Sequence, residues 1–179
     1  MAATFVVETG TASATANSYC SVADSIQYHE NYGNPVAWSG ASQATKENAL
    51  REATRALDFR YGSRWSGFRY TSTQALDWPR SYAIDSAGNE ISETTIPQRL
   101  KDAAAILALL HVQGTNINPT TRTEGDIRSE SLQAASGASK AVTYAGSKPA
   151  EAQLLQVDRL LGTSGLLSGG TGGWGWLDL

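Results

Sequence analysis

The chain has 179 residues, a formal net charge of −3 at pH 7, a sequence pI of about 5.4 and one cysteine. This length fits one domain with an added arm. The acidic balance argues against a general nucleic-acid binder, whose affinity comes from a basic excess, and a single cysteine excludes an internal disulfide. Charged residues make up only 17% of the chain, a composition that suits a surface packed against neighbouring proteins.

Neither the N-terminus nor the most apolar stretch of the sequence indicates contact with a membrane. The N-terminus, MAATFVVETG, lacks the basic region of a signal peptide. The most apolar stretch, residues 103–112, is too short to cross a bilayer. We therefore expect a soluble protein, made in a cytoplasm, with no membrane partner.

The first half of the chain predicts two helices. A capping box at Ser21 to Asp24 indicates the start of a helix that ends near Gly33, and Asn34-Pro35 breaks it. Apolar residues at helical spacing then predict a helix over residues 44–60, which Gly62 ends.

The middle of the chain is irregular up to a third helix. Residues 62–90 are rich in aromatic side chains, with a turn at Asp85–Asn89 that indicates a small hairpin tip. Ile96-Pro97 opens the next helix, with proline at its first position. Residues 100–112 are apolar on nearly all sides, so this helix is either central or wedged between the domain and a neighbour.

The last third predicts a hairpin, a helix and an arm. Alternation around Gly137 predicts a β-hairpin over about residues 126–145, and a helix follows over 150–161. The predicted fold class is mainly α: a small bundle of about four helices, a hairpin insertion and an extended Gly-rich C-terminal arm. The expected domain covers residues 1–161, and the arm covers residues 162–179.

No motif in the sequence supports an enzyme. His29 and His111 fall on or beside apolar helix faces, where a core or interface histidine is the better interpretation. Cys20 has no partner context for a nucleophile, so a buried thiol is expected. No residue spacing suits a metal or a phosphate-binding loop, and we expect no catalytic residue, metal or cofactor.

Residues 51–80 combine arginines with aromatic side chains, as a single-strand binder does for phosphates and bases. These arginines are candidates for contact with DNA or with a neighbouring subunit. They could instead stack on rings or pair with acids at a subunit contact, and this structural interpretation is the favoured one. The candidates are Arg51, Arg55, Arg60, Arg64 and Arg69, interleaved with Phe59, Tyr61, Trp65, Phe68, Tyr70 and Trp78.

The C-terminal arm carries large apolar residues behind a glycine tether, GGTGGWGWLDL. Disordered tails are usually poor in such residues, whereas aromatic residues commonly anchor interfaces. The tether gives reach without imposing a direction. The arm therefore suggests docking in a groove on another chain, or folding back onto its own domain; its candidate docking residues are Trp174, Trp176, Leu177 and Leu179.

The block TQALDWPR, residues 73–80, lies after RATRALDFRYGSRWSG and before IPQRLKDAAAILAL, with VETGTASATANSYCSVADSIQYHENYG upstream. This order, from about Val7 to Leu161, resembles tailed-phage head–tail connector, or adaptor, proteins of the head-completion type. Proteins of this family are often described as DnaT-like single-stranded-DNA-binding proteins. That description gives an alternative: a single-strand binder that serves replication.

The resemblance implies a structural virion protein at the head–tail interface, assembled in the host cytoplasm. Such adaptors form a homo-oligomeric ring, typically twelvefold, beneath the portal protein. They extend the DNA channel and present a docking surface for the next connector or tail-completion protein. Packaged DNA would pass through the lumen without sequence-specific binding, and the arm would contact the portal or a neighbouring subunit.

Within the block, Trp78 and Pro79 are expected to be local fold determinants, because proline restricts the residue before it. The indole of Trp78 would cap the bundle, while Arg80 would be held pointing outward. Trp65 is a further candidate for a fold or interface determinant.

Overall fold

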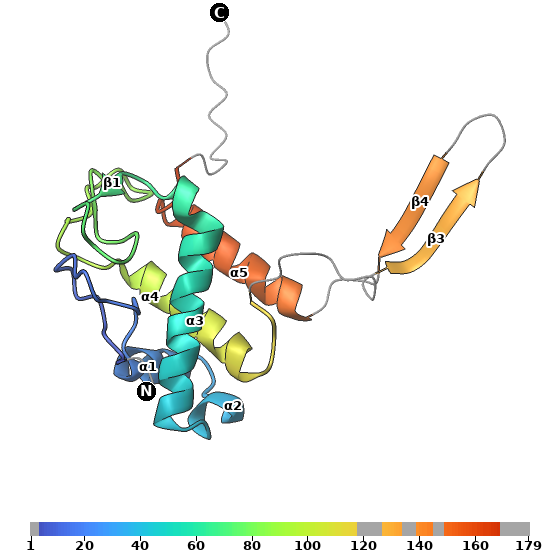
Figure 1. Ribbon diagram of the computed structural model, residues 1–179, viewed down its shortest axis with the longest axis horizontal. Helices are drawn as coiled ribbons and strands as arrows, with labels where there is room; N and C mark the ends of the chain where they lie inside the picture. The colour runs from blue at the N-terminus through green and yellow to red at the C-terminus, as the bar shows by residue number, and fades with distance from the viewer. Residues whose placement is uncertain (1–3, 118–126, 134–138, 145–148, 169–179) are drawn as a thin grey trace, which may run out of the picture.

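The computed structural model describes residues 4–117, 127–133, 139–144 and 149–168. In these ranges the chain forms five α-helices and two two-stranded antiparallel sheets (Figure 1). The prediction of a small, mainly helical domain with a β-hairpin is confirmed, with one helix more than expected. The elements are α1 (Val22–Asn31), α2 (Val36–Ser39), α3 (Gln43–Tyr61), β1 (Phe68–Arg69), β2 (Arg80–Ser81), α4 (Gln98–Val112), β3 (Ile127–Gln133), β4 (Ser139–Tyr144) and α5 (Pro149–Thr163).

Helix α1 begins at the predicted cap. The Ser21 hydroxyl accepts a hydrogen bond from the Asp24 backbone N–H at 3.0 Å, which satisfies a donor that the first turn would otherwise leave unpaired. The extra helix, α2, follows directly after Pro35 and buries Trp38. The proline that was expected only to break the chain therefore also begins a new short helix.

Helix α4 is the central element of the body. Its buried residues lie on nearly every side, and helices α1, α2, α3 and α5 all pack against it. Figure 1 shows it crossing behind the longest helix, α3. Of the two expected positions for this apolar helix, the structure shows the central one. It begins one residue later than expected, with Pro97 at the cap position.

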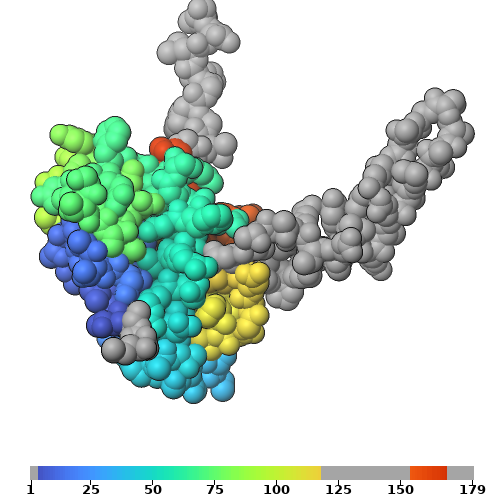
Figure 2. All heavy atoms as spheres, viewed as in Figure 1, coloured from blue at the N-terminus to red at the C-terminus, as the bar shows by residue number. Residues whose placement is uncertain are grey.

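The segment between α3 and α4 contains little regular structure, as expected. It forms one end of the body, at the end of α3 opposite α1 and α2 (Figure 2). A ribbon made by β1 and β2 pairs Phe68 with Ser81 and Arg69 with Arg80. Beyond it, an isolated bridge between Ile84 and Glu90 closes the predicted hairpin tip.

The predicted hairpin insertion is present. Strands β3 and β4 pair in antiparallel register from Ile127 opposite Tyr144 to Gln133 opposite Ser139. Figure 1 shows the hairpin extending away from the helices.

The body extends past the predicted boundary at residue 162. Helix α5 continues to Thr163, and the following residues pack on the segment after α3. Leu166 and Leu167 are buried, Leu166 accepts a hydrogen bond from the Ser66 N–H at 2.8 Å, and the Ser168 N–H donates to the Arg64 carbonyl at 2.6 Å. Residues 162–168 therefore belong to the body, and an arm can begin only after Ser168.

Candidate functional site

Three of the five candidate arginines are bound to groups of their own chain. Arg60 donates to Asp158 on α5 at 3.0 Å, which ties α3 to α5. Arg55 forms an ion pair with Glu52 at 3.5 Å. Arg69 donates to the Gln74 backbone carbonyl, and lies 4.0 Å from an Asp77 carboxylate oxygen. These side chains are partly neutralised before any partner arrives.

The other two candidates lie over aromatic rings. The Arg51 guanidinium carbon lies 6.0 Å from the centre of the Phe5 ring, and that of Arg64 lies 6.0 Å from the centre of the Tyr61 ring. These distances suit cation–π attraction. The candidate arginines thus stack on rings or pair with acids of their own chain, whereas the sequence interpretation placed such contacts at a subunit contact.

Arg80 is buried, so the expectation that it points outward is wrong. Its guanidinium donates to three backbone carbonyls: those of Ser66 at 2.7 Å, Gly67 at 2.7 Å and Asp77 at 3.2 Å. The irregular segment has carbonyls without partners in a helix or sheet, and the planar fork of arginine can satisfy several of them at once. Burial lowers the pKa of the Arg80 guanidinium.

Trp78 and Trp65 form an aromatic pair inside the body. The Trp78 side chain is fully buried, and Trp65 is 3% exposed. Their rings meet edge to face with centroids 6.1 Å apart, a favourable arrangement for aromatic pairs. The peptide bond between Trp78 and Pro79 is cis. The end of the block, residues 78–80, therefore lies in the core, whereas Thr73 and Ala75 at its start are exposed.

A cluster of three polar residues joins distant segments of the chain. Tyr19 donates to the Asp58 carboxylate at 2.5 Å and accepts from the Asp77 backbone N–H at 3.0 Å. Burial, and to a smaller extent the nearby Asp77 carboxylate, raise the pKa of the Asp58 carboxyl to about 7, although the hydrogen bond from Tyr19 acts in the opposite direction. Sequence reasoning missed this cluster because its members come from the N-terminal segment, α3 and the irregular segment.

Exposed aromatic side chains lie along β1, β2 and their continuation. Phe68 is 71% exposed and Tyr82 is 74% exposed, and Tyr70 and Ile84 are exposed as well. We call this group of side chains, three aromatic residues and Ile84, the aromatic ribbon. On α3, Phe59 is also 79% exposed. Of the aromatic residues interleaved with the arginines, Phe59, Phe68 and Tyr70 are thus available to a partner, while Tyr61, Trp65 and Trp78 are buried.

The backbone holds the aromatic ribbon in a fixed shape. Gly67 has a φ of +69°, and a Cβ there would lie 2.3 Å from the Ser81 carbonyl oxygen, so only glycine fits this close approach. Tyr82 has a φ of +57°, which is an uncommon conformation for a bulky residue and often marks a functional position. Arg80 binds the carbonyls of residues 66 and 67 from the inner side.

A family model described as "Putative DnaT-like ssDNA binding protein" matches residues 3–177. The chain belongs to this family. No curated protein and no solved structure matches the chain. The match to the DnaT-like family spans the hairpin and continues through Trp174, Trp176 and Leu177, so both the hairpin and most of the C-terminal segment lie within the length that defines the family.

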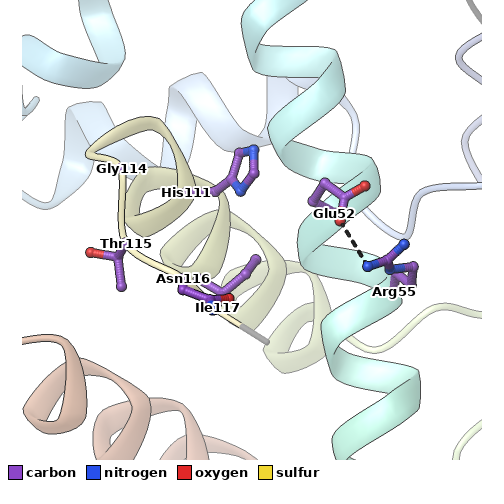
Figure 3. Close-up of a pocket in the computed structure, with 7 residues that line it drawn as sticks. All are labelled: Glu52, Arg55, His111, Gly114, Thr115, Asn116 and Ile117. Atoms are coloured by element: carbon purple, nitrogen blue, oxygen red, sulfur yellow. Dashed lines mark ion pairs between the residues drawn. The ribbon is translucent and has the colours of Figure 1, made fainter. Parts of the chain in front are cut away.

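This member of the DnaT-like family has a shallow polar pocket between α3 and the end of α4 (Figure 3). Its volume is about 340 Å³. Figure 3 shows the Glu52–Arg55 ion pair on one wall and His111 on the other. The ion pair with Glu52 reduces the attraction that Arg55 would exert on a phosphate group in this pocket. The lining residues are Glu52, Arg55, His111, Gly114, Thr115, Asn116 and Ile117.

Cys20 and His29 are core residues, as the sequence predicts for the thiol and allows for the histidine. Cys20 is buried, and burial raises the pKa of its thiol to about 12, which keeps it protonated and unreactive. His29 is buried, and its Nε2 lies 3.2 Å from the Ala105 carbonyl. Among the described residues, no group of His, Cys, Asp and Glu side chains could hold a metal ion.

The predicted docking residues Trp174, Trp176, Leu177 and Leu179 lie outside the described residues. The last described residue, Ser168, lies against the carbonyl of Arg64. Arg64 precedes the first residue of the aromatic ribbon, Phe68, by four positions. None of the described helices is both long and apolar enough to span a membrane.

Proposed function

We propose that this chain is a structural subunit of a tailed-phage particle: a head-to-tail adaptor that forms a ring beneath the portal. One observation carries the proposal. The arginines of the candidate site are bound within their own chain, whereas large apolar side chains of the same region are exposed. Such a surface suits contact with protein better than contact with phosphate.

The exposed apolar side chains support assembly. Single exposed apolar residues are ordinary on a monomer, but a group on one element commonly marks an interaction site. In the aromatic ribbon, four such side chains lie in β1 or within three residues of the end of β1 or β2. Phe59 on α3 adds another exposed ring, and aromatic residues are the usual anchors of protein interfaces.

The charge of the chain supports a passive channel. A ring through which packaged DNA moves must not hold phosphates, because a basic lumen would bind them strongly. The chain has a net charge of −3, and at least three of its arginines are paired with carboxylates. In a ring, each subunit would present one face to the next, and repetition around the axis would close it.

The partners follow from the sequence resemblance to head–tail connectors. They are further copies of the chain in a ring, twelvefold in the proteins it resembles, together with the portal protein and a downstream connector or tail-completion protein. The hairpin, which extends away from the helices, is suited to reach a neighbour. Trp174, Trp176, Leu177 and Leu179 are the proposed docking residues of the C-terminal segment.

A second candidate function is single-stranded-DNA binding in replication. The family description names this activity. It therefore favours single-stranded-DNA binding over the adaptor function. The exposed rings of Phe68 and Tyr70 beside Arg69 could stack on bases, since stacking needs no base sequence. Against it stand the net charge and the internal pairing of the arginines.

Disruption of the gene separates the two functions. For the adaptor, electron microscopy should show heads that assemble and package DNA, then leak it and carry no tails. Complementation with the intact gene should restore tailed particles. Normal tailed particles in reduced number, with impaired DNA synthesis, would contradict the adaptor and support the single-strand binder.

A further inference from the structure

The aromatic ribbon is a site without an occupant in the described part of the chain. Its exposed side chains, Phe68, Tyr70, Tyr82 and Ile84, are presented on a backbone fixed by Gly67 and Arg80. Leaving such rings in water costs roughly 25 cal/mol for each Å² of apolar surface. Because the backbone under these side chains is already held in place, a partner that binds them does not have to offset the entropy cost of ordering that backbone.

The chain itself supplies a segment with matching chemistry. Beyond Ser168 come eleven residues, GGTGGWGWLDL, which end in two tryptophans and two leucines around one aspartate. Tryptophan and leucine bury large apolar areas. The segment therefore offers the kind of surface that the aromatic ribbon could cover.

The point where the described chain ends brings this segment to the ribbon. Leu167 forms a β-bridge with Trp65. Phe68 comes three residues after Trp65, so the two Cα atoms are at most about 10 Å apart, at about 3.3 Å per residue. The stretch from Leu167 to Trp174 can extend to about 23 Å on the same scale. Trp174 and Trp176 can thus reach the ribbon of their own chain with slack to spare.

Tethering favours the chain's own segment over that of another copy. A short flexible linker gives an effective concentration in the millimolar range, which free subunits in a cell do not approach. We propose that, in the isolated subunit, residues 169–179 fold back so that Trp174 and Trp176 cover the aromatic ribbon. The inference concerns the free chain and does not rest on the phage assignment.

The experiment uses the full chain with 5-fluorotryptophan and ¹⁹F NMR. The signals of the two C-terminal residues are assigned with Trp174→Phe and Trp176→Phe, and a soluble gadolinium chelate measures their exposure. We expect both signals to be protected from relaxation. The double variant Phe68→Ser with Tyr82→Asn should remove that protection, since asparagine tolerates the positive φ of position 82.

A matched control and a dilution series make the result decisive. Phe59→Ser removes an equally exposed ring from α3 and should leave the protection intact, and an unchanged Trp78 signal shows that each variant is folded. Tail signals that are as exposed in the native chain as in the ribbon variant would overturn the proposal. Protection that appears only as protein concentration rises would also overturn it and assign the segment to a second copy.

Discussion

At the scale of single residues, the block around Trp78 shows how an irregular segment is held without helices or sheets. Arg80 satisfies the carbonyls of Ser66, Gly67 and Asp77, while Trp78 fills the space against Trp65. The sequence pointed to this block, but it gave the wrong direction for Arg80. A sequence cannot show which carbonyls lack partners, because that depends on the path of the folded backbone.

Replacing Trp78 with alanine should destabilise the body by about 3–5 kcal/mol, because a fully buried indole leaves a cavity. Urea denaturation followed by circular dichroism measures the change in free energy of unfolding. Phe59→Ala is the control; because that ring is 79% exposed, its replacement should change stability by no more than about 0.5 kcal/mol. Equal effects of the two substitutions would mean that Trp78 does not lie in the core.

The Asp58 carboxyl should make stability depend on pH. Its pKa is raised from 3.8 to about 7 in the folded chain, so between these values the folded state holds a proton that the unfolded state has lost. Stability from this group therefore falls as pH rises from about 4 to about 7. Urea midpoints measured at pH 5, 6, 7 and 8 should decline, and Asp58→Asn should flatten that decline.

The control for the pH series is Glu90→Gln, which alters an exposed carboxylate. This variant should keep the slope of the native chain. A native chain whose stability stays constant or increases from pH 5 to pH 8, with the same profile in Asp58→Asn, would show that Asp58 ionises without cost in the folded state.

At the scale of elements, the helices could be predicted from the sequence because their caps and apolar spacing are local features. Ser21 and Ser42 both cap the helices that follow them, and apolar spacing marked α3 and α4. The packing of residues 164–168 could not be predicted, since it depends on contacts between segments about a hundred residues apart. The arm was consequently predicted to begin too early.

Two deletions should separate body from arm. Removal of residues 169–179 should leave the helical signal and cooperative unfolding intact, because every helix and every buried residue described lies at or before Ser168. Removal of residues 164–179 should lower the melting temperature, since it takes away the buried Leu166 and Leu167, each contributing about 1.5–3 kcal/mol. Thermal unfolding followed by circular dichroism measures both, and similar melting temperatures for the two deletions would contradict the boundary.

At the scale of the whole molecule, charge pairing determines what the surface attracts. The sequence placed arginines and aromatic residues together, and the structure separates them: the arginines are paired within the chain, and several rings are exposed. That separation could not be predicted from composition, because Asp158, the partner of Arg60, comes from α5.

The adaptor proposal predicts weak binding of single-stranded DNA. Fluorescence anisotropy with a labelled oligothymidine at physiological salt should show no saturation below about 100 μM, the weak end of non-specific affinity. Saturable binding that is lost in Phe68→Ser with Tyr70→Ser, but kept in the control Tyr32→Ser, would contradict this and favour the second candidate. Tyr32 is equally exposed but lies at the end of α1.

The hydrogen bonds from Ser168 to the Arg64 carbonyl have a consequence for biosynthesis. A ribosome releases the N-terminal helices first, at about 5–20 residues per second, yet the segment after α3 acquires its hydrogen bonds to residues 166 and 168 only when nearly the whole chain has been made. Nascent or truncated chains therefore cannot complete the body. Only chains that extend through Ser168 would hold the segment after α3 in its final shape, so synthesis past this point determines which molecules can associate.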